Sequence, residues 1–255
     1  EKGVPYVEKH IRGAFFTQSV FLITDRKNHI YNRRNVVKWR KRKSAENGET
    51  ADLEKEETNM YFGVQMYGVS KEWKQDPKGF LKKIYEAGYR QIEPCLGFRV
   101  DARDYGFWIP EDLEQAMPLL AKYHIEVHAV HIFLDEYHYE RELAILTELA
   151  QKYHISWFVV KSPARQTKDV LDETAARYRE LAEELEKAGA GLLIHNEKED
   201  ICIRVNGKTA YEYLLEACGE KVGAEVDVGW MYCGGVDPEA VSYTHLRAHE
   251  TSAHL

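Results

Sequence analysis

Polar side chains that can bind metals or move protons stand at the ends of short apolar runs in this sequence. They are Gln65, Glu93, His128, His131, Lys161, His195, Asn196, Glu197, Glu225 and Asp227. Carboxylate and imidazole groups are common ligands of divalent metals. A bound divalent ion can polarise a carbonyl group while a nearby carboxylate moves a proton. Residues of these types are therefore the first candidates for metal ligands or proton-transfer groups.

The apolar runs alternate with longer segments of helical period, which is typical of βα units around a parallel sheet. We predict strands at 62–66, 91–94, 126–132, 157–160, 191–195 and 222–228. The predicted fold is α/β, an incomplete (β/α)8 TIM barrel with about six βα units. The active site of such a barrel lies at the carboxyl ends of the strands. The polar residues above stand at that end.

The third strand carries two histidines, and alternation along the strand separates them. His128 and His131 are three residues apart, so their side chains face opposite sides of the strand. Only one of them can point into the mouth of the barrel. We expect His131 to do so.

The chain divides into three segments by pattern. Residues 1–59 show no lasting period, and we expect a non-barrel extension, disordered or not native, with the native chain beginning at Met60. Residues 60–241 form the partial barrel. Residues 242–255 are rich in His, Ser and Thr where an apolar helix face should develop, and they resemble a translated adapter tail. We expect the barrel to stop before its last two units, which leaves its first and sixth strands with open edges.

The amino-acid composition argues against several kinds of partner and location. The net charge of −7 argues against nucleic acid as a partner, because affinity for phosphate backbones comes chiefly from Lys and Arg. The four cysteines lack paired CxxC spacing, so we expect a reducing, cytoplasmic location. No apolar run approaches the roughly 18 residues that span a bilayer, so we expect no membrane partner.

Five motifs together resemble the xylose-isomerase-like sugar phosphate isomerase/epimerase family of TIM barrels. The resemblance covers residues 60–241, and its most specific part is the last two motifs at their separation. The motifs are Phe-Gly-Val-Gln-Met-Tyr at 62–67, Gln-Ile-Glu at 91–93, Ile-His-Asn at 194–196, Glu-Val-Asp-Val-Gly-Trp at 225–230 and Gly-Gly-Val-Asp-Pro at 234–238.

The resemblance implies one divalent metal (Mn, Co, Mg or Zn), held by two Glu, one Asp and one His from the last four strands. Asp227 matches the Asp position. Many relatives read His-Asn-His where this chain has His195, Asn196 and Glu197, which leaves open whether His195 or Glu197 approaches the metal. The ligands of strands seven and eight have no counterpart, so we expect an incomplete metal site.

Roles follow from this resemblance, and each residue also has a structural interpretation. Asp227 and His195 are the expected metal ligands, and Glu197 and His195 the expected catalytic residues. Asp227 could instead cap a helix, and Glu197 could lie in a solvated loop. Sugar contacts are expected from Gln65, Glu93, His131, Asn196 and Trp230.

The resulting hypothesis is a metal-dependent isomerase or epimerase of a small sugar or sugar phosphate, compatible with a homo-oligomer. Metal-dependent dehydration of cyclic polyols, or elimination from oxidised glycosides, is an alternative that needs the same groups. An apurinic-site endonuclease is disfavoured, because it needs more strand-end His and Asp residues and a basic DNA track. Because the barrel is truncated, we expect this chain by itself to be inactive, and the non-enzyme alternative is an inactive fragment or scaffold without turnover.

Overall fold

The described strands of this computed structural model form a six-stranded, mainly parallel sheet, a three-stranded parallel sheet and a two-stranded hairpin. The structure describes residues 21–23, 63–134 and 138–236. In chain order the parallel strands are β2 (Gly63–Gln65), β3 (Gln91–Glu93) with β4 (Cys95–Leu96), β5 (Glu126–Val127) with β6 (Ala129–Ile132), β7 (Trp157–Lys161), β8 (Gly191–His195) and β11 (Val222–Asp227). Each pairs with its neighbour in parallel. The six predicted βα strands are therefore confirmed, and the barrel is not closed among the described residues.

Two of the predicted strands are interrupted. Pro94 separates β3 from β4, and His128 separates β5 from β6. Proline has no N–H to donate to a sheet ladder. The carbonyl of Pro94 still accepts a bond of 2.9 Å from the amide of His131. The register shifts by one residue across the interruption, because Ile92 lies opposite Val127 whereas Cys95 lies opposite His131.

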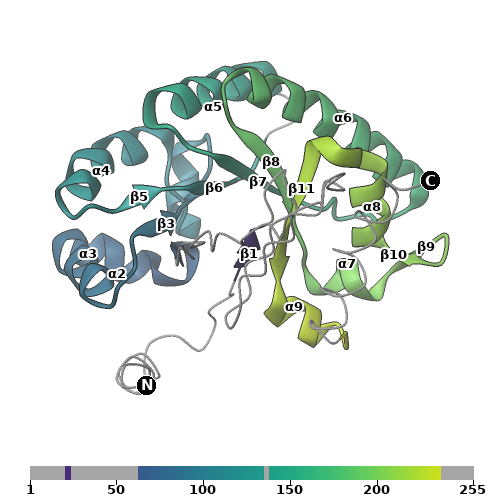
Figure 1. Ribbon diagram of the computed structural model, residues 1–255, viewed down its shortest axis with the longest axis horizontal. Coiled ribbons are helices and arrows are strands. Elements are labelled where there is room, and N and C mark those ends of the chain that lie inside the picture. The colour runs from purple at the N-terminus through teal and green to yellow at the C-terminus, as the bar shows by residue number, and fades with distance from the viewer. Residues whose placement is uncertain (1–20, 24–62, 135–137, 237–255) are drawn as a thin grey trace, which may run out of the picture.

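A short strand, β1 (Phe21–Ile23), pairs antiparallel with β11, with Phe21 opposite Asp227. We expected an open edge at the sixth barrel strand, and β1 instead covers that edge at residues 225–227. The pairing satisfies backbone groups that an open edge would expose. Figure 1 shows β1 beside β11.

The helices follow the strands around the outside of the sheet (Figure 1). They are α2 (Ser70–Gln75), α3 (Pro77–Glu86), α4 (Pro110–Lys122), α5 (Tyr139–Tyr153), α6 (Lys168–Lys187), α7 (Lys198–Cys202), α8 (Ala210–Cys218) and α9 (Val228–Cys233). Short 3-10 turns stand at Tyr67–Val69, Val100–Tyr105 and Gly219–Lys221, and a hairpin pairs β9 (Arg204–Val205) with β10 (Lys208–Thr209). None of the described helices is long and apolar enough to cross a membrane.

Helix ends follow local chemistry. Asp76 caps α3 by accepting a 2.9 Å bond from the amide of Gly79, and Pro77 is the first helical residue, as the Asp-Pro pair indicates. Asp227 caps α9 in the same way, through the amide of Trp230 at 3.0 Å. The sixth barrel strand therefore ends one residue earlier than predicted. The sequence also predicts a helix opened by Pro238, and that residue lies outside the described part of the chain.

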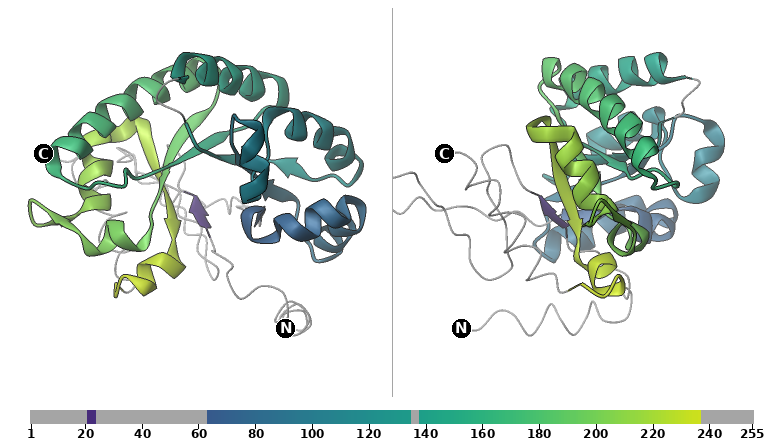
Figure 2. Two further views of the ribbon diagram at one scale, coloured as in Figure 1. Left: turned by 180° about the vertical axis from the view of Figure 1, so that it is seen from behind. Right: turned by 90° about the vertical axis from the view of Figure 1, so that its right-hand side faces the viewer.

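Two layers of side chains fill the concave side of the sheet. Ala129, Val159 and Leu193 form a small buried apolar cluster, with Trp157 packed against it. The residue two positions further along each of these strands is polar: His131, Lys161 and His195. Because alternate residues of a strand face the same side, the apolar layer supports a polar layer at the carboxyl ends of the strands. The larger core lies between sheet and helices, whose layering Figure 2 shows from the side.

Gly191 leaves room for the ring of Trp157 at the base of this apolar layer. A Cβ atom at Gly191 would lie 2.3 Å from Cζ3 of Trp157. We expect Gly191→Ala to lower the free energy of unfolding by about 1–3 kcal/mol, the usual cost of overpacking. Gly63→Ala in β2 is the matched control, because its nearest contact would be 3.4 Å. Urea denaturation of both variants tests this, and equal stabilities would contradict it.

Candidate active site

Five ionisable side chains converge at the carboxyl ends of the strands, and we call them the inner polar cluster. They are buried, with exposed fractions of 7% for Glu93, 4% for His131, 6% for His195, 0% for Glu225 and 1% for Asp227. They come from β3, β6, β8 and β11. The curvature of the sheet therefore brings together residues far apart in sequence.

Two close pairs and a ring contact connect the cluster. Nδ1 of His131 lies 3.9 Å from Oε1 of Glu93, and Nε2 of His195 lies 3.4 Å from Oδ2 of Asp227. The two imidazole rings are 5.1 Å apart between centroids. His131 thus lies inside the site, as predicted, while His128 is only half-buried, at the break between β5 and β6. The expected substrate and metal residues Glu93, His131, His195 and Asp227 are adjacent in the fold.

Glu225 lies on the same face of β11 as Asp227 and beside His195 in register. Sequence reasoning noted its position at the strand end and assigned it no role. The signal was available, since residues i and i+2 of a strand share a face. When Glu225 is ionised, neither of its carboxylate oxygens has a hydrogen-bond partner in the described part of the protein. Burying such a group without compensation is costly.

Burial sets the protonation of this cluster in the absence of metal. It raises the pKa of Glu225 well above its usual range, and the neighbouring carboxylates of Glu93 and Asp227 add to the effect. It also raises the pKa of Glu93, although a hydrogen bond with Glu225 and the charge of His195 oppose this. Burial lowers the pKa of His131, helped by the charges of His195 and Lys161. Metal-free protein therefore favours a protonated Glu225 that donates to Glu93, beside a neutral His131.

A pH dependence of stability follows for metal-free protein. The pKa of Glu225 is higher in the folded than in the unfolded chain, so the folded state holds an extra proton between those two values. The stabilisation is present below the unfolded value and is lost as pH rises toward the folded value. We therefore expect Glu225→Gln to gain stability relative to the natural chain between about pH 4.5 and about pH 7.5.

Urea unfolding of Glu225→Gln and of the natural chain, with a chelator present at about pH 4.5 and about pH 7.5, measures this difference in stability. Because His131 is present in both proteins, its opposite pH dependence largely cancels in the comparison. A stability difference that stays the same at the two pH values would contradict the assignment.

Asn196 fixes the position of Asp227. Its Nδ2 donates to the carbonyl of Asp227 at 3.1 Å, and its Oδ1 accepts from the amide of Asp227 at 2.8 Å. The hydroxyl of Tyr211, on α8, lies 2.8 Å from the carbonyl of Ile194 and 3.2 Å from that of Glu225. Both side chains tie the end of β8 to the end of β11. Asn196 was predicted as a sugar contact, and its amide bonds support a positioning role.

We expect Asn196→Ala to lower the free energy of unfolding by about 1–3 kcal/mol, because it removes two hydrogen bonds to the buried backbone of Asp227. Thermal and urea unfolding measure the change. Thr147→Ala is the control, since that hydroxyl bonds only to Ala144 on the exposed face of its own helix. A loss no larger than the control's would show that Asn196 does not hold the two strand ends.

The remaining predicted residues lie around the cluster rather than in it. Glu197 forms an ion pair with Lys161, and both side chains are partly exposed. It stands directly before α7, so the interpretation of 197–200 as a solvated loop is wrong. Gln65 donates to Sγ of Cys95 at 3.0 Å and accepts from the amide of Tyr67 at 2.7 Å. Trp230 is 42% exposed on α9.

An aromatic wall, defined by Phe107, Phe133 and His131, adjoins the ion pair. Phe133 stacks on Phe107 at 4.4 Å and on His131 at 5.4 Å between ring centroids, both nearly parallel. Nζ of Lys161 lies 5.5 Å from the Phe133 centroid. Sequence reasoning did not identify this wall, because its rings come from a loop and from the end of β6.

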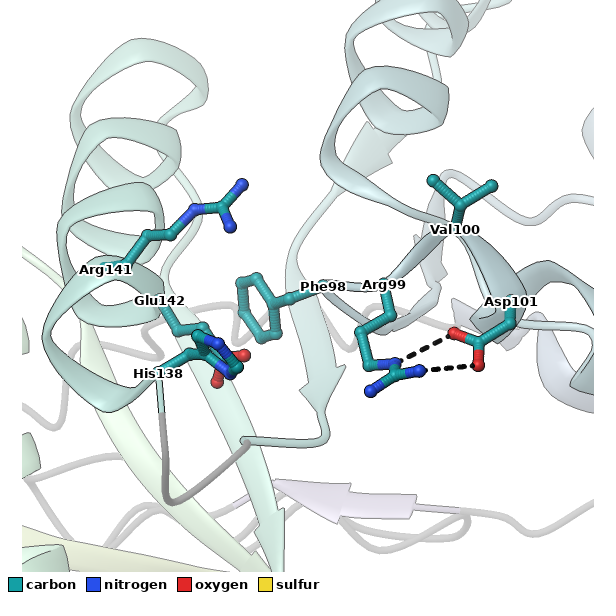
Figure 3. A pocket seen from close by; sticks show the side chains of 7 residues that line it. All are labelled: Phe98, Arg99, Val100, Asp101, His138, Arg141 and Glu142. Carbon is teal, nitrogen blue, oxygen red and sulfur yellow. Dashed lines mark hydrogen bonds and ion pairs between the residues drawn. The ribbon is translucent and has the colours of Figure 1, made fainter.

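A separate pocket of about 570 Å³ lies on the loops after β4 and at the start of α5. In Figure 3 Phe98 points toward His138 and Glu142, while Arg99 pairs with Asp101. None of the inner polar cluster lines this pocket. The chemistry we describe therefore belongs to the strand ends and not to this cavity.

No family model matches this chain. No curated protein matches it. Several solved structures match this chain. A sugar phosphate isomerase/epimerase from Parabacteroides distasonis matches with a TM-score of 0.59 and 21% identity, over 73% of this chain and 72% of that one. The fold is that of the xylose-isomerase-like TIM barrels.

Two further structures share this fold. The probable 3-DHS dehydratase AsbF from Bacillus anthracis matches with a TM-score of 0.54 and 16% identity, over 74% of this chain and 70% of that one. The IOLI protein with a bound zinc atom matches with a TM-score of 0.51 and 14% identity, over 72% of this chain and 68% of that one. The structural neighbours thus include both an isomerase/epimerase and a dehydratase. At these identities the likeness concerns the fold.

Proposed function

We propose that this chain carries the strand-end site of a divalent-metal-dependent isomerase or epimerase of a small sugar. The observation that carries the proposal is the buried pair of His195 and Asp227, 3.4 Å apart at the carboxyl ends of neighbouring strands. Structural likeness to a sugar phosphate isomerase/epimerase supports the substrate class.

The spacing of this pair suits one shared ion. Two donors at tetrahedral angles, each about 2.0–2.1 Å from zinc, lie about 3.4 Å apart. Nε2 of His195 and Oδ2 of Asp227 have that separation. The other oxygen of Asp227 accepts from Trp230 and Asn196 holds its backbone, so outer contacts orient the ligand as metal sites require. A divalent ion held there would act as a Lewis acid toward the sugar carbonyl.

The residues around the pair supply the other functions. Glu197 is the proposed base, and the ammonium group of Lys161 orients its carboxylate at the rim of the site. A base within hydrogen-bond reach of the proton next to a carbonyl typically contributes 10²- to 10⁴-fold, about 3–5 kcal/mol. Glu93 and His131 face the interior, where they can bond sugar hydroxyl groups. The aromatic wall and Trp230 offer ring faces for the apolar side of a sugar.

Deuterium exchange tests this function without knowledge of the substrate. A panel of aldoses, ketoses and their phosphates is incubated in D₂O with the protein and Mn²⁺, and proton NMR follows exchange next to the carbonyl. We expect exchange on at least one sugar, lowered about 10²- to 10⁴-fold in Glu197→Gln and abolished in Asp227→Asn. Glu114→Gln, an exposed partner of Lys152, is the control and should exchange normally.

The same proton NMR spectra distinguish an isomerase or epimerase from a dehydratase and from a scaffold without turnover. Loss of water from the carbon skeleton would show a dehydratase instead. Absence of exchange from every sugar, in protein that is folded and binds Mn²⁺, would contradict the proposal and favour a scaffold without turnover.

A further inference from the structure

Three members of the inner polar cluster form a donor set separate from the His195 and Asp227 pair. Glu93, His131 and Glu225 each offer one ligand atom, and these atoms all lie within 4.8 Å of one another. The residues come from β3, β6 and β11, so the curvature of the sheet and not a local motif brings them together.

The set lacks the protein partners that buried polar groups normally have. With both carboxyl groups ionised, Oε1 of Glu93, Nε2 of His131 and both oxygens of Glu225 have no hydrogen-bond partner in the described part of the protein. Two buried carboxyl groups side by side without a cation repel each other when ionised. One divalent ion would compensate both charges and use the imidazole nitrogen as a third ligand.

The spacing and donor chemistry agree with this use. At tetrahedral angles the donors of one zinc ion lie about 3.4 Å apart, so side-chain rotations would have to draw the three atoms together from the 4.8 Å within which they lie. Two carboxylates and one imidazole suit a first-row cation such as Mn²⁺, Co²⁺ or Zn²⁺. We propose that Glu93, His131 and Glu225 bind one such cation as a site of their own, beside the His195 and Asp227 pair.

This site would use Glu93 and His131 as cation ligands in place of the sugar contacts proposed above, and it does not depend on the His195 and Asp227 pair. Asp227 is absent from the donor set and is held by Asn196 and by the cap of α9. Glu225 is fully buried beneath it and makes no contribution to either of those contacts. Substitutions at the two positions should therefore affect metal binding separately.

The test is calorimetric titration of chelator-treated protein with Zn²⁺, repeated with Co²⁺ so that the visible spectrum reports the ligand field. We expect Glu225→Gln and Glu93→Gln each to remove one cation per chain, or to weaken it by at least about 10- to 100-fold, the loss that even an outer-shell change causes. Asp227→Asn should leave that cation bound. Glu142→Gln, a buried carboxyl of α5 outside the cluster, is the control and should bind as the natural chain does.

Folding is monitored in the same samples. Glu225→Gln should melt at the same or a higher temperature than metal-free natural protein, so lost binding cannot be assigned to unfolding. Unchanged Zn²⁺ binding in Glu225→Gln would overturn the site and leave a carboxyl pair that shares a proton. Loss of all binding in both Glu225→Gln and Asp227→Asn would overturn it in favour of one shared ion. If the protein binds the cation at this site but no sugar exchanges deuterium, the proposed function is contradicted and the cation site is supported.

Discussion

The cost of burying Glu93 and Glu225 against each other is the constraint on which the site depends. Both carboxyl groups face the interior of the curved sheet, where water cannot compensate their charge. A protein of marginal stability keeps such a pair only where something compensates it. In metal-free protein a shared proton does so, and a divalent cation would do so with both groups ionised. Stability and cation binding are therefore two consequences of one arrangement.

The rest of the structure holds that arrangement in place. The apolar layer of Ala129, Val159 and Leu193 supports the polar layer from below. Asn196 and Tyr211 fix the end of β8 against the end of β11, and the cap of α9 uses one oxygen of Asp227. These contacts leave the other oxygen facing His195. The groups that could bind an ion are thus positioned by neighbours whose own bonds are satisfied.

Much of this could be predicted from local rules. The alternation of apolar runs with helical segments predicted six parallel strands, and strand parity correctly placed His131 rather than His128 inside. The pairing of β1 with β11 could not be predicted, because no period marks residues 21–23. The closeness of Glu93 and Glu225 depends on sheet curvature, which no local pattern encodes. The use of Asn196 as a tie between strands required knowing which strands are neighbours.

In our proposal the buried strand-end carboxylates and histidines form cation sites. Anomalous diffraction from crystals grown with Mn²⁺ tests it most directly, because the signal locates the ion without assumptions about ligands. We expect one peak among Glu93, His131 and Glu225 and another between His195 and Asp227. Well-ordered strand ends with no anomalous peak at either place would contradict it.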